Sequence, residues 1–319
     1  MRKVGLLSVA VPCHNEQEVL PSTHKRLRSV LDKLAADKKC ADYELIYVDD
    51  GSKDNTLGVL KDIFENDKFV RVIVLRNNFG HQGAITAGMA CARGDAVVTL
   101  DADLQDPPEK IGDMISHYEE DYDLVLGVRK DRSSDSLMKK FFAENYYRFL
   151  KFLGVDIVHN HGDFRLMARA LVDEFNALPE RNRFIRAMIL SLESRYATVY
   201  YNRESRKHGK TKFTPGVMLS FSMDGIVSFS YMPLRLVALS GIFMCIIALI
   251  GVAWVIHGKF FRYTAPGWTS TLAPILAIGG FQLFALGLIG EYVGRLYIEV
   301  KQRPLFLVRK EYTHKMETR

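Results

Sequence analysis

Clusters of polar residues follow four short apolar runs in the N-terminal third of the chain. They include carboxylates that could share a metal ion, since hard cations such as Mg²⁺ prefer oxygen ligands. Such a cation would let acidic residues hold a phosphorylated ligand that they would otherwise repel. Asp101 and Asp103 form the central pair, and a turn or capping role is the alternative for them. The four clusters are residues 12–16, 49–52, 76–78 and 101–106.

Several other chemistries lack their sequence signatures. Neither GxGxxG nor GxxxxGK[ST] occurs, which argues against a dinucleotide oxidoreductase and a P-loop NTPase. The four cysteines form no CxxC pair, so neither a disulfide framework nor a zinc knuckle is expected. His159 and His161 have no further His or Cys at zinc-ligand spacing. His81, at the start of an expected helix, suits either a phosphate contact or an ordinary helix cap.

The polar clusters stand at the ends of expected β-strands. Short runs rich in β-branched residues are typical of strands buried on both faces, and they lie at 6–11, 43–48, 70–75, 96–100 and 123–128. Helical patterns alternate with them, at 17–35, 55–66, 82–93 and 108–121. This alternation predicts an α/β, Rossmann-like fold with a mostly parallel sheet. Ligands of such sheets bind beyond the carboxyl ends of the strands, where the polar clusters lie.

Two uncharged runs lie in the C-terminal third of the chain. Residues 236–256 carry no charge, and as a helix they would be about 31 Å long, enough to cross a bilayer. The second run, 264–290, is expected to span from 272 to 290, because Pro and Gly interrupt its start. Basic residues flank both runs on their outer sides, which places both termini in the cytoplasm. We therefore expect a multi-pass protein of the bacterial inner membrane with a cytoplasmic catalytic part.

These patterns divide the chain into four parts. They are a catalytic domain at 1–202, a basic and amphipathic membrane-surface segment at 203–233, a two-helix transmembrane anchor at 234–294 and a basic cytosolic tail at 295–319. The basic flanks explain the net charge of +6 and favour contact with membrane lipids. No nucleic-acid-binding motif is present, so nucleic acid is not an expected partner. Glycines of the second run, such as Gly287 and Gly290, allow close helix contacts within the anchor or in a homo-oligomer.

Six motifs give the chain a specific resemblance. In order, VPCHNE, DDGS, RNNFGHQGA, DADLQDPPE, GDFRLM and RKHGKTKF resemble glycosyltransferase family 2, and with the two uncharged runs they resemble its polyprenyl-phosphate glycosyltransferases. GDFRLM, PERN and GEYVGR are most similar to the bactoprenol glucosyltransferases of serotype conversion, which modify the O-antigen of lipopolysaccharide. The resemblance implies a nucleotide-binding fold of the A type, a UDP-sugar donor, undecaprenyl phosphate as acceptor, and Mg²⁺ or Mn²⁺ as cofactor.

The resemblance also assigns roles to individual residues. It implies that Asp103 and Gln105 bind the cation, while Asp101 completes the metal shell or contacts the nucleotide. The donor pocket would be lined by Pro12, Asn15, Glu16, Asp49, Asp50 and Arg76. Basic residues would neutralise phosphates where donor and acceptor meet, namely Arg206, Lys210 and Lys212, with Arg129 and Arg165 as further ligands of the acceptor phosphate.

The implied reaction is attack by the lipid phosphate oxygen on the anomeric carbon of the sugar, with inversion and loss of UDP. A phosphate monoester has its second pKa near 6, so the nucleophile is largely ionised at pH 7 and needs no strong base. Asp163 matches the residue proposed as the base in similar enzymes, and positioning the acceptor, the sugar or Arg165 is an equally good role. Glucose is the favoured sugar, and N-acetylglucosamine, which differs at C2, is the alternative.

Two other functions fit the sequence less well. A processive polysaccharide synthase would carry a Gln-x-x-Arg-Trp element, which is absent. A non-catalytic membrane scaffold or lipid carrier would leave the clustered carboxylates without a purpose, and they would be costly to hold together without a cation. Transfer of a single sugar at the inner leaflet would require a flippase and a second glycosyltransferase downstream.

Overall fold

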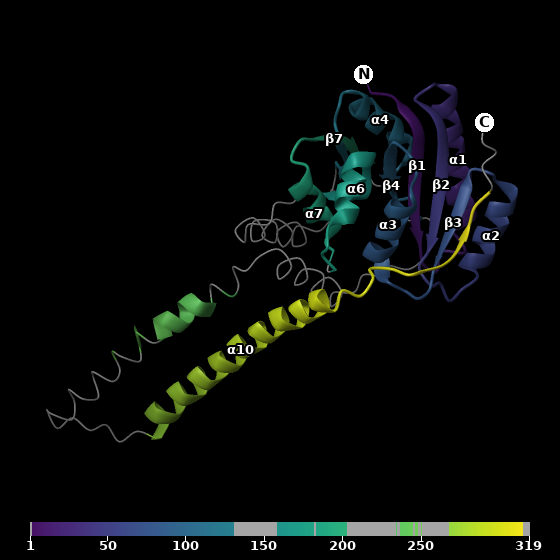
Figure 1. Cartoon of the computed structure of the whole chain (residues 1–319). Coiled ribbons are helices and arrows are strands. Elements are labelled where there is room, and N and C mark those ends of the chain that lie inside the picture. The colour runs from purple at the N-terminus through teal and green to yellow at the C-terminus, as the bar shows by residue number, and fades with distance from the viewer. Residues whose placement is uncertain are drawn as a thin grey trace, which may run out of the picture.

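A β-sheet lies at the centre of the compact part of the molecule and carries helices on both faces (Figure 1). The computed structural model describes residues 2–130, 158–181, 183–202, 234, 237–244, 246, 247, 250 and 268–314. The described strands are ordered β7-β5-β6-β4-β1-β2-β3-β8 across the sheet. Their bounds are β1 Val4–Cys13, β2 Cys40–Asp49, β3 Val70–Leu75, β4 Ala96–Thr99, β5 Leu124–Arg129, β6 His161–Ala168, β7 Tyr196–Tyr201 and β8 Val308–Tyr312.

Most of the described strands run in one direction. β1 pairs in parallel with β2 and β4, β2 with β3, and β5 with β7. Two strands run the opposite way, because β6 is antiparallel to both β4 and β5, and β8 is antiparallel to β3. The predicted α/β fold with a mostly parallel sheet is confirmed, and all five predicted strands are present.

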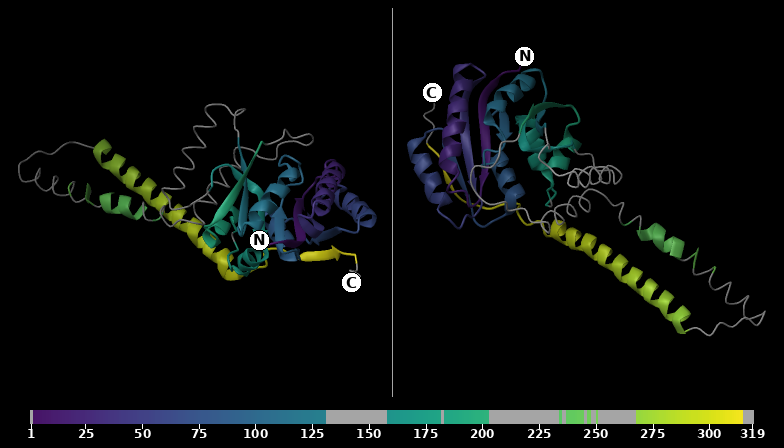
Figure 2. Two further views of the ribbon diagram at one scale, coloured as in Figure 1. Left: turned by 90° about the horizontal axis from the view of Figure 1, so that it is seen from above. Right: turned by 180° about the vertical axis from the view of Figure 1, so that it is seen from behind.

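Two helical layers bury the sheet (Figure 2). Leu27 and Leu31 of α1 pack with Val9 on one face, and Ile85 of α3 and Phe175 of α6 pack with the other face. Because successive strand residues point to opposite faces, a sheet covered on both sides needs apolar residues at nearly every strand position. The helices whose bounds the described residues give are α1 Leu20–Ala36, α2 Thr56–Asn66, α3 Gly80–Cys91, the 3-10 helix η1 Pro108–Lys110, α4 Ile111–Glu119, α6 Arg169–Ala177, α7 Ile185–Leu192 and α10 Trp268–Lys301.

The strand β8 lies at one edge of the sheet, beside β3. Arg71 of β3 has a nearly buried side chain and bonds Glu44 of β2 at 2.7 Å and Glu311 of β8 at 2.6 Å. The backbone N–H of Arg76 also donates to the carbonyl of Leu307 at 2.8 Å. The segment expected as a cytosolic tail, 295–319, therefore contains a strand of the central sheet.

Replacing Glu311 with glutamine is expected to lower the free energy of unfolding by about 1 kcal/mol. Arg71 would lose one charged partner, but it keeps Glu44, and solvent already screens Glu311, whose side chain is 35% exposed. Urea unfolding followed by circular dichroism measures the change. Glu120→Gln, at an exposed carboxylate after α4, is the matched control. An unchanged midpoint for Glu311→Gln would show that the ion pair between Arg71 and Glu311 does not stabilise the fold.

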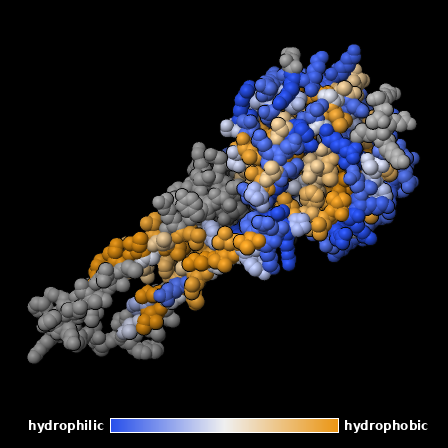
Figure 3. Space-filling view, in the orientation of Figure 1, coloured by the Kyte–Doolittle hydropathy of each residue, from blue (hydrophilic) through white to orange (hydrophobic). Residues whose placement is uncertain are grey.

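The helix α10 leaves the sheet and carries large apolar side chains that stay exposed, such as Leu283 and Phe284 (Figure 3). Its C-terminal end contacts the part of the chain that holds the sheet: the two carboxylate oxygens of Glu299 accept hydrogen bonds from the backbone N–H of Arg181 at 2.9 and 3.0 Å. The uncharged run at 272–290 is thus only part of a longer helix, whose last turns carry Glu291, Arg295 and Glu299.

No helix among the described residues is both long enough and apolar enough to cross a membrane. The predicted pair of transmembrane helices, and with it the predicted inner-membrane location, is therefore contradicted. Much of the first predicted span, 236–256, and all of the membrane-surface segment at 203–233 lie outside the described residues.

Candidate active site

In the structure, a strand that was not predicted, β6, also contributes residues to the polar edge of the sheet. β6 reaches this edge with its first residues, because it runs antiparallel to β4. Arg165 of β6 pairs with Thr99 of β4, so Asp163 lies past the end of β4 and close to Asp101. The hydroxyl of Thr99 also donates to the main-chain oxygen of Asp163. Two aspartates from distant parts of the sequence thus share one site.

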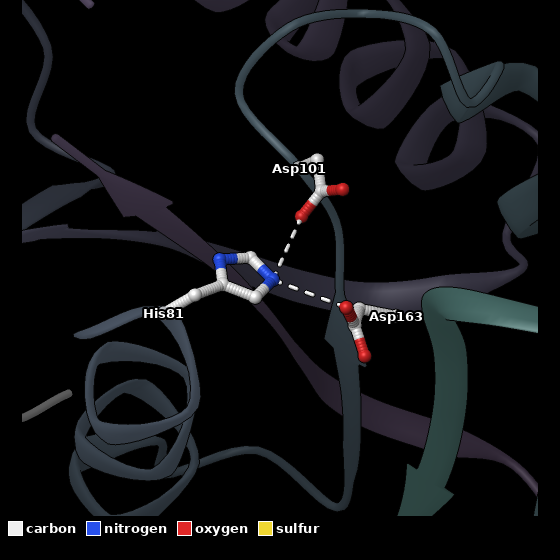
Figure 4. A group of neighbouring side chains, drawn as sticks. All are labelled: His81, Asp101 and Asp163. Carbon is white, nitrogen blue, oxygen red and sulfur yellow. Dashed lines mark hydrogen bonds and ion pairs between the residues drawn. The ribbon is translucent and has the colours of Figure 1, made fainter. Parts of the chain in front are cut away.

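His81, at the start of α3, joins these two aspartates (Figure 4). Its Nε2 donates to Asp163 Oδ2 at 3.1 Å and lies 3.5 Å from Asp101 Oδ1. One ligand atom from each of the three residues lies within 4.8 Å of the others, so the group could hold a metal ion. The His81 side chain is 42% exposed, whereas that of Asp163 is only 5% exposed. The cluster therefore opens to solvent on the His81 side.

Two arginines also bind Asp163. Arg165 Nη2 donates to Asp163 Oδ1 at 2.6 Å, and Arg186 Nη2, from α7, donates to Oδ2 at 3.1 Å. Burial alone would raise the pKa of Asp163, but Arg186, His81 and Arg165 outweigh it and hold that pKa well below its usual range. Asp163 is therefore an ionised carboxylate at any pH at which the protein works, and its proton affinity is too low for a strong base.

The same cluster shifts the pKa values of His81 and Asp101 upwards. Burial would lower the pKa of His81, but the hydrogen bond to Asp163 and the charges of Asp101 and Asp163 raise it to about 9. Burial raises the pKa of Asp101 to about 6; His81 opposes this rise, and Asp163, Asp106 and Asp103 add to it. At neutral pH, His81 is therefore an imidazolium beside two carboxylates.

The stability of the protein is expected to fall as the pH rises from about 7 to above 9, in part because of His81. A histidine whose pKa is raised on folding contributes its full stabilisation below the unfolded value of about 6.5, and that contribution disappears as the pH passes the folded value. Urea unfolding at pH 6 and pH 9.5 measures the difference, and His81→Gln should reduce it. An equal pH dependence in wild type and His81→Gln would contradict this assignment.

The predicted metal ligands lie together after β4. Gln105 donates its backbone N–H to Asp103 Oδ1 at 3.1 Å, and Leu104 between them has a φ of 56°, which marks a tight turn. Asp101 Oδ1 is buried and accepts no hydrogen bond among the described residues. A cation on this oxygen would offset both its desolvation and the repulsion from neighbouring carboxylates. Asp101, Asp103 and Gln105 supply only oxygen ligands, which suits a hard divalent cation.

The predicted donor-pocket residues gather at the ends of β1, β2 and β3. The carboxylate of Asp50 accepts the backbone N–H of Phe79 at 2.7 Å, and that of Asp49 accepts the N–H of Ser52 at 3.3 Å. Asn15 adopts a φ of 54° and accepts the N–H of Lys53 at 2.8 Å. These bonds join the turns that follow β1, β2 and β3. Pro12 is buried at the end of β1, Glu16 is half-buried and Arg76 is exposed.

The turn after β2 requires glycine. Gly51 has a φ of +62°, and a Cβ there would lie 2.8 Å from the backbone of Asn77 and Asn78. The turns after β2 and β3 therefore approach each other more closely than any other residue would allow.

The predicted acceptor residues fall into three groups. Arg129, at the end of β5, keeps a side chain that is 25% exposed. Arg165 is fully buried, so in this structure it contacts Asp163 and no acceptor could reach it. Arg206, Lys210 and Lys212 lie outside the described residues.

Two residues of the cluster did not emerge from the sequence with the roles that they have here. His81 was compatible with a cap or a phosphate contact, but its pairing with Asp101 and Asp163 depends on where α3 lies against β4 and β6. Arg186 belongs to a short helix without a recognised motif. The packing of α3 and α7 against the sheet brings these two residues to Asp163, and no pattern in the neighbouring sequence could have identified that contact.

The chain is similar to known glycosyltransferases. A family model described as glycosyl transferase family 2 matches residues 8–175. The chain is 42% identical over 307 residues to the uncharacterized glycosyltransferase YkcC of Bacillus subtilis (strain 168), covering 96% of this chain and 94% of the relative. It is 36% identical over 308 residues to the SfII prophage-derived bactoprenol glucosyl transferase of Shigella flexneri, covering 96% and 98%.

Solved structures give a more distant match. Glucosyl-3-phosphoglycerate synthase from Mycobacterium tuberculosis, in complex with Mn²⁺, UDP and phosphoglyceric acid, is 19% identical with a TM-score of 0.48. The match covers 70% of this chain and 76% of that one.

Proposed function

The chain belongs to glycosyl transferase family 2, and from this premise we propose that it moves one sugar from a UDP-sugar to a polyprenyl phosphate. The choice of acceptor is supported by the 36% identity to a bactoprenol glucosyl transferase over almost the full length of both chains. The name of that relative also favours glucose as the sugar. That the chain is a glycosyltransferase follows from the family itself.

The proposed reaction is a single displacement at the anomeric carbon. An oxygen of the acceptor phosphate forms the new bond to that carbon, the bond to the UDP oxygen breaks, and the configuration inverts. At pH 7 a phosphate monoester is already largely ionised, because its second pKa is near 6. The reaction therefore needs groups that position and neutralise phosphates rather than a strong base.

Asp163 fits a positioning role in this reaction. Its carboxylate is shared by Arg165, Arg186 and His81, whose positive charges hold its pKa well below the usual range. Arg165 is fully buried, while Arg186 and His81 are both partly exposed. Asp163 therefore holds two accessible cations at the edge of the sheet, where the phosphates of donor and acceptor would meet.

A divalent cation, Mg²⁺ or Mn²⁺, would be held by Asp101, Asp103 and Gln105. This group is favoured over His81, Asp101 and Asp163, because two arginines already neutralise Asp163 and would repel a metal ion. When bound, such a cation stabilises the charge that develops on a diphosphate leaving group. Pro12, Asn15, Glu16, Asp49, Asp50 and Arg76 would hold the nucleoside of the donor at the neighbouring strand ends.

The proposal is tested with the purified full-length protein in detergent with undecaprenyl phosphate. Separate reactions contain UDP-glucose, UDP-N-acetylglucosamine, UDP-galactose or GDP-mannose, each with Mg²⁺, Mn²⁺ or EDTA. We expect UDP release and a monoglycosylated lipid with UDP-glucose and a divalent cation only. Product with UDP-N-acetylglucosamine alone would change the sugar, and nucleotide release without a lipid product would contradict the acceptor.

A further inference from the structure

Asp106, Arg129 and Tyr201 form a hydrogen-bonded group beside the site. The Tyr201 hydroxyl donates a hydrogen bond to Asp106 Oδ1 at 2.7 Å. The same hydroxyl oxygen accepts a hydrogen bond from the Nε–H of Arg129 at 3.3 Å. Arg129 Nη2 lies 3.4 Å from Asp106 Oδ1. The three residues come from the turn after β4 and from the ends of β5 and β7. The three residues lie far apart along the chain, so the fold brings them together.

The tyrosine of this group is held firmly. Its ring packs edge-on against Phe164 with 5.7 Å between the ring centroids, and a Cβ on Gly127 would come within 3.1 Å of it. The preceding residue of β7, Tyr200, lies on the opposite face of the strand and is 52% exposed. The Tyr201 hydroxyl therefore has a fixed position from which to orient Arg129.

Burial of Asp106 holds the arginine in place. Asp106 is 1% exposed, and among the described residues its Oδ2 has no hydrogen-bond partner. A buried carboxylate that loses its cation pays a large desolvation cost, so Asp106 strongly favours the conformer in which Arg129 stays beside it. An arginine restrained in this way loses less side-chain entropy when it binds an anion.

The guanidinium of Arg129 lies against the backbone that leads into Asp163. A Cβ on Gly162 would come within 2.9 Å of Arg129 Nη2, so the guanidinium lies directly against the backbone there. Gly162 immediately precedes Asp163, which binds Arg186. Arg129 thus reaches the same edge of the sheet as Asp163, and its side chain stays 25% exposed.

We propose that Asp106 and Tyr201 are positioning residues that hold the guanidinium of Arg129 toward the phosphate of the acceptor. The inference rests on the proposed function, because it assumes that an acceptor phosphate binds at this edge. Neither residue contacts the substrate, and both act through Arg129. The residues proposed as ligands of the donor and of the cation would touch those molecules directly, and the cation ligands share the turn after β4 with Asp106.

The test is a double-mutant cycle on the full-length enzyme with a UDP-sugar and undecaprenyl phosphate. Tyr201→Phe removes the hydroxyl and keeps the ring, and Tyr200→Phe on the same strand is the matched control. We expect Tyr201→Phe to raise KM for undecaprenyl phosphate about fivefold, the size of one lost hydrogen bond, with KM for the donor unchanged. Tyr200→Phe should leave both constants unchanged.

The second arm of the cycle uses Arg129→Lys, which keeps the charge but not the planar fork. If Tyr201 acts through Arg129, then Tyr201→Phe should have no further effect on KM in the Arg129→Lys background. Additive effects, or a Tyr201→Phe variant that matches Tyr200→Phe, would overturn the inference while leaving the proposed function intact. A wild-type enzyme that makes no lipid-linked sugar would overturn the proposed function, and the inference with it.

Discussion

Replacing Asp101 with asparagine is expected to lower kcat for sugar transfer by about three orders of magnitude, because a bound cation contributes several kcal/mol to the transition state. Asp101 Oδ1 is buried, accepts no hydrogen bond among the described residues and lies 3.5 Å from His81 Nε2, so a divalent cation bound there would replace the imidazolium as its counter-charge. The amide keeps the shape of the side chain and removes its charge. Steady-state kinetics with Mg²⁺ and Mn²⁺ measure the loss, and calorimetry should show that the variant no longer binds UDP with the metal.

Stability provides an independent readout for Asp101→Asn. Burial raises the pKa of Asp101 to about 6, although His81 opposes that rise, so the carboxylate is still ionised at neutral pH but its ionisation costs stability relative to the unfolded protein. The variant should therefore unfold at the same or a higher urea concentration than wild type. Asp113→Asn, at an exposed carboxylate of α4, is the control for activity. Full activity of Asp101→Asn would contradict its role as a metal ligand.

Asp163→Asn is expected to lower kcat by about two orders of magnitude through misplacement of Arg186 and His81 rather than through loss of a base. It should also destabilise the fold by about 3 kcal/mol, because Arg165 is fully buried and would lose its carboxylate partner. The pH profile of the wild-type rate separates the two roles. Since the pKa of Asp163 is held well below its usual range, the rate should fall below about pH 6, where the acceptor phosphate gains a proton.

The control for this prediction is Asp173→Asn, at an exposed carboxylate on α6. It should leave the rate and its pH profile unchanged. The decisive comparison is the residual activity of Asp163→Asn. If the rate of Asp163→Asn falls below about pH 6 as that of wild type does, the fall belongs to the substrate phosphate or to Asp101, whose pKa is about 6, whereas its disappearance would identify Asp163 as the base.

The sequence was enough to predict the central strands of the fold. Strands buried on both faces are continuous apolar runs, so 43–48 and 70–75 were found almost to their ends in β2 and β3. β8, with the sequence VRKEY, is an exposed edge strand and carries no such run. β6 is apolar, but its antiparallel direction depends on its partners, which no local pattern specifies. The run at 272–290 does lie in a helix, α10, but no helix among the described residues is both long enough and apolar enough to cross a membrane, so the membrane prediction failed.

The functional site was predictable where its residues follow strand ends. Asp101 and Asp103 were identified because a carboxylate pair at the end of a buried strand is unusual. The pairing of Asp101 with Asp163 required the register of β4 against β6, in which Thr99 faces Arg165. The ion pair between Arg186 of α7 and Asp163 could be recognised only from the folded structure.

Formation of a monoglycosylated polyprenyl phosphate is the most direct test of the central claim. Mass spectrometry of the lipid fraction, after incubation of the full-length enzyme with UDP-glucose, undecaprenyl phosphate and Mn²⁺, measures the product itself. We predict a product one hexose heavier than the acceptor that is absent with EDTA and with Asp101→Asn. An unmodified lipid under conditions in which the enzyme binds UDP with metal would contradict the claim and show that the acceptor is another molecule.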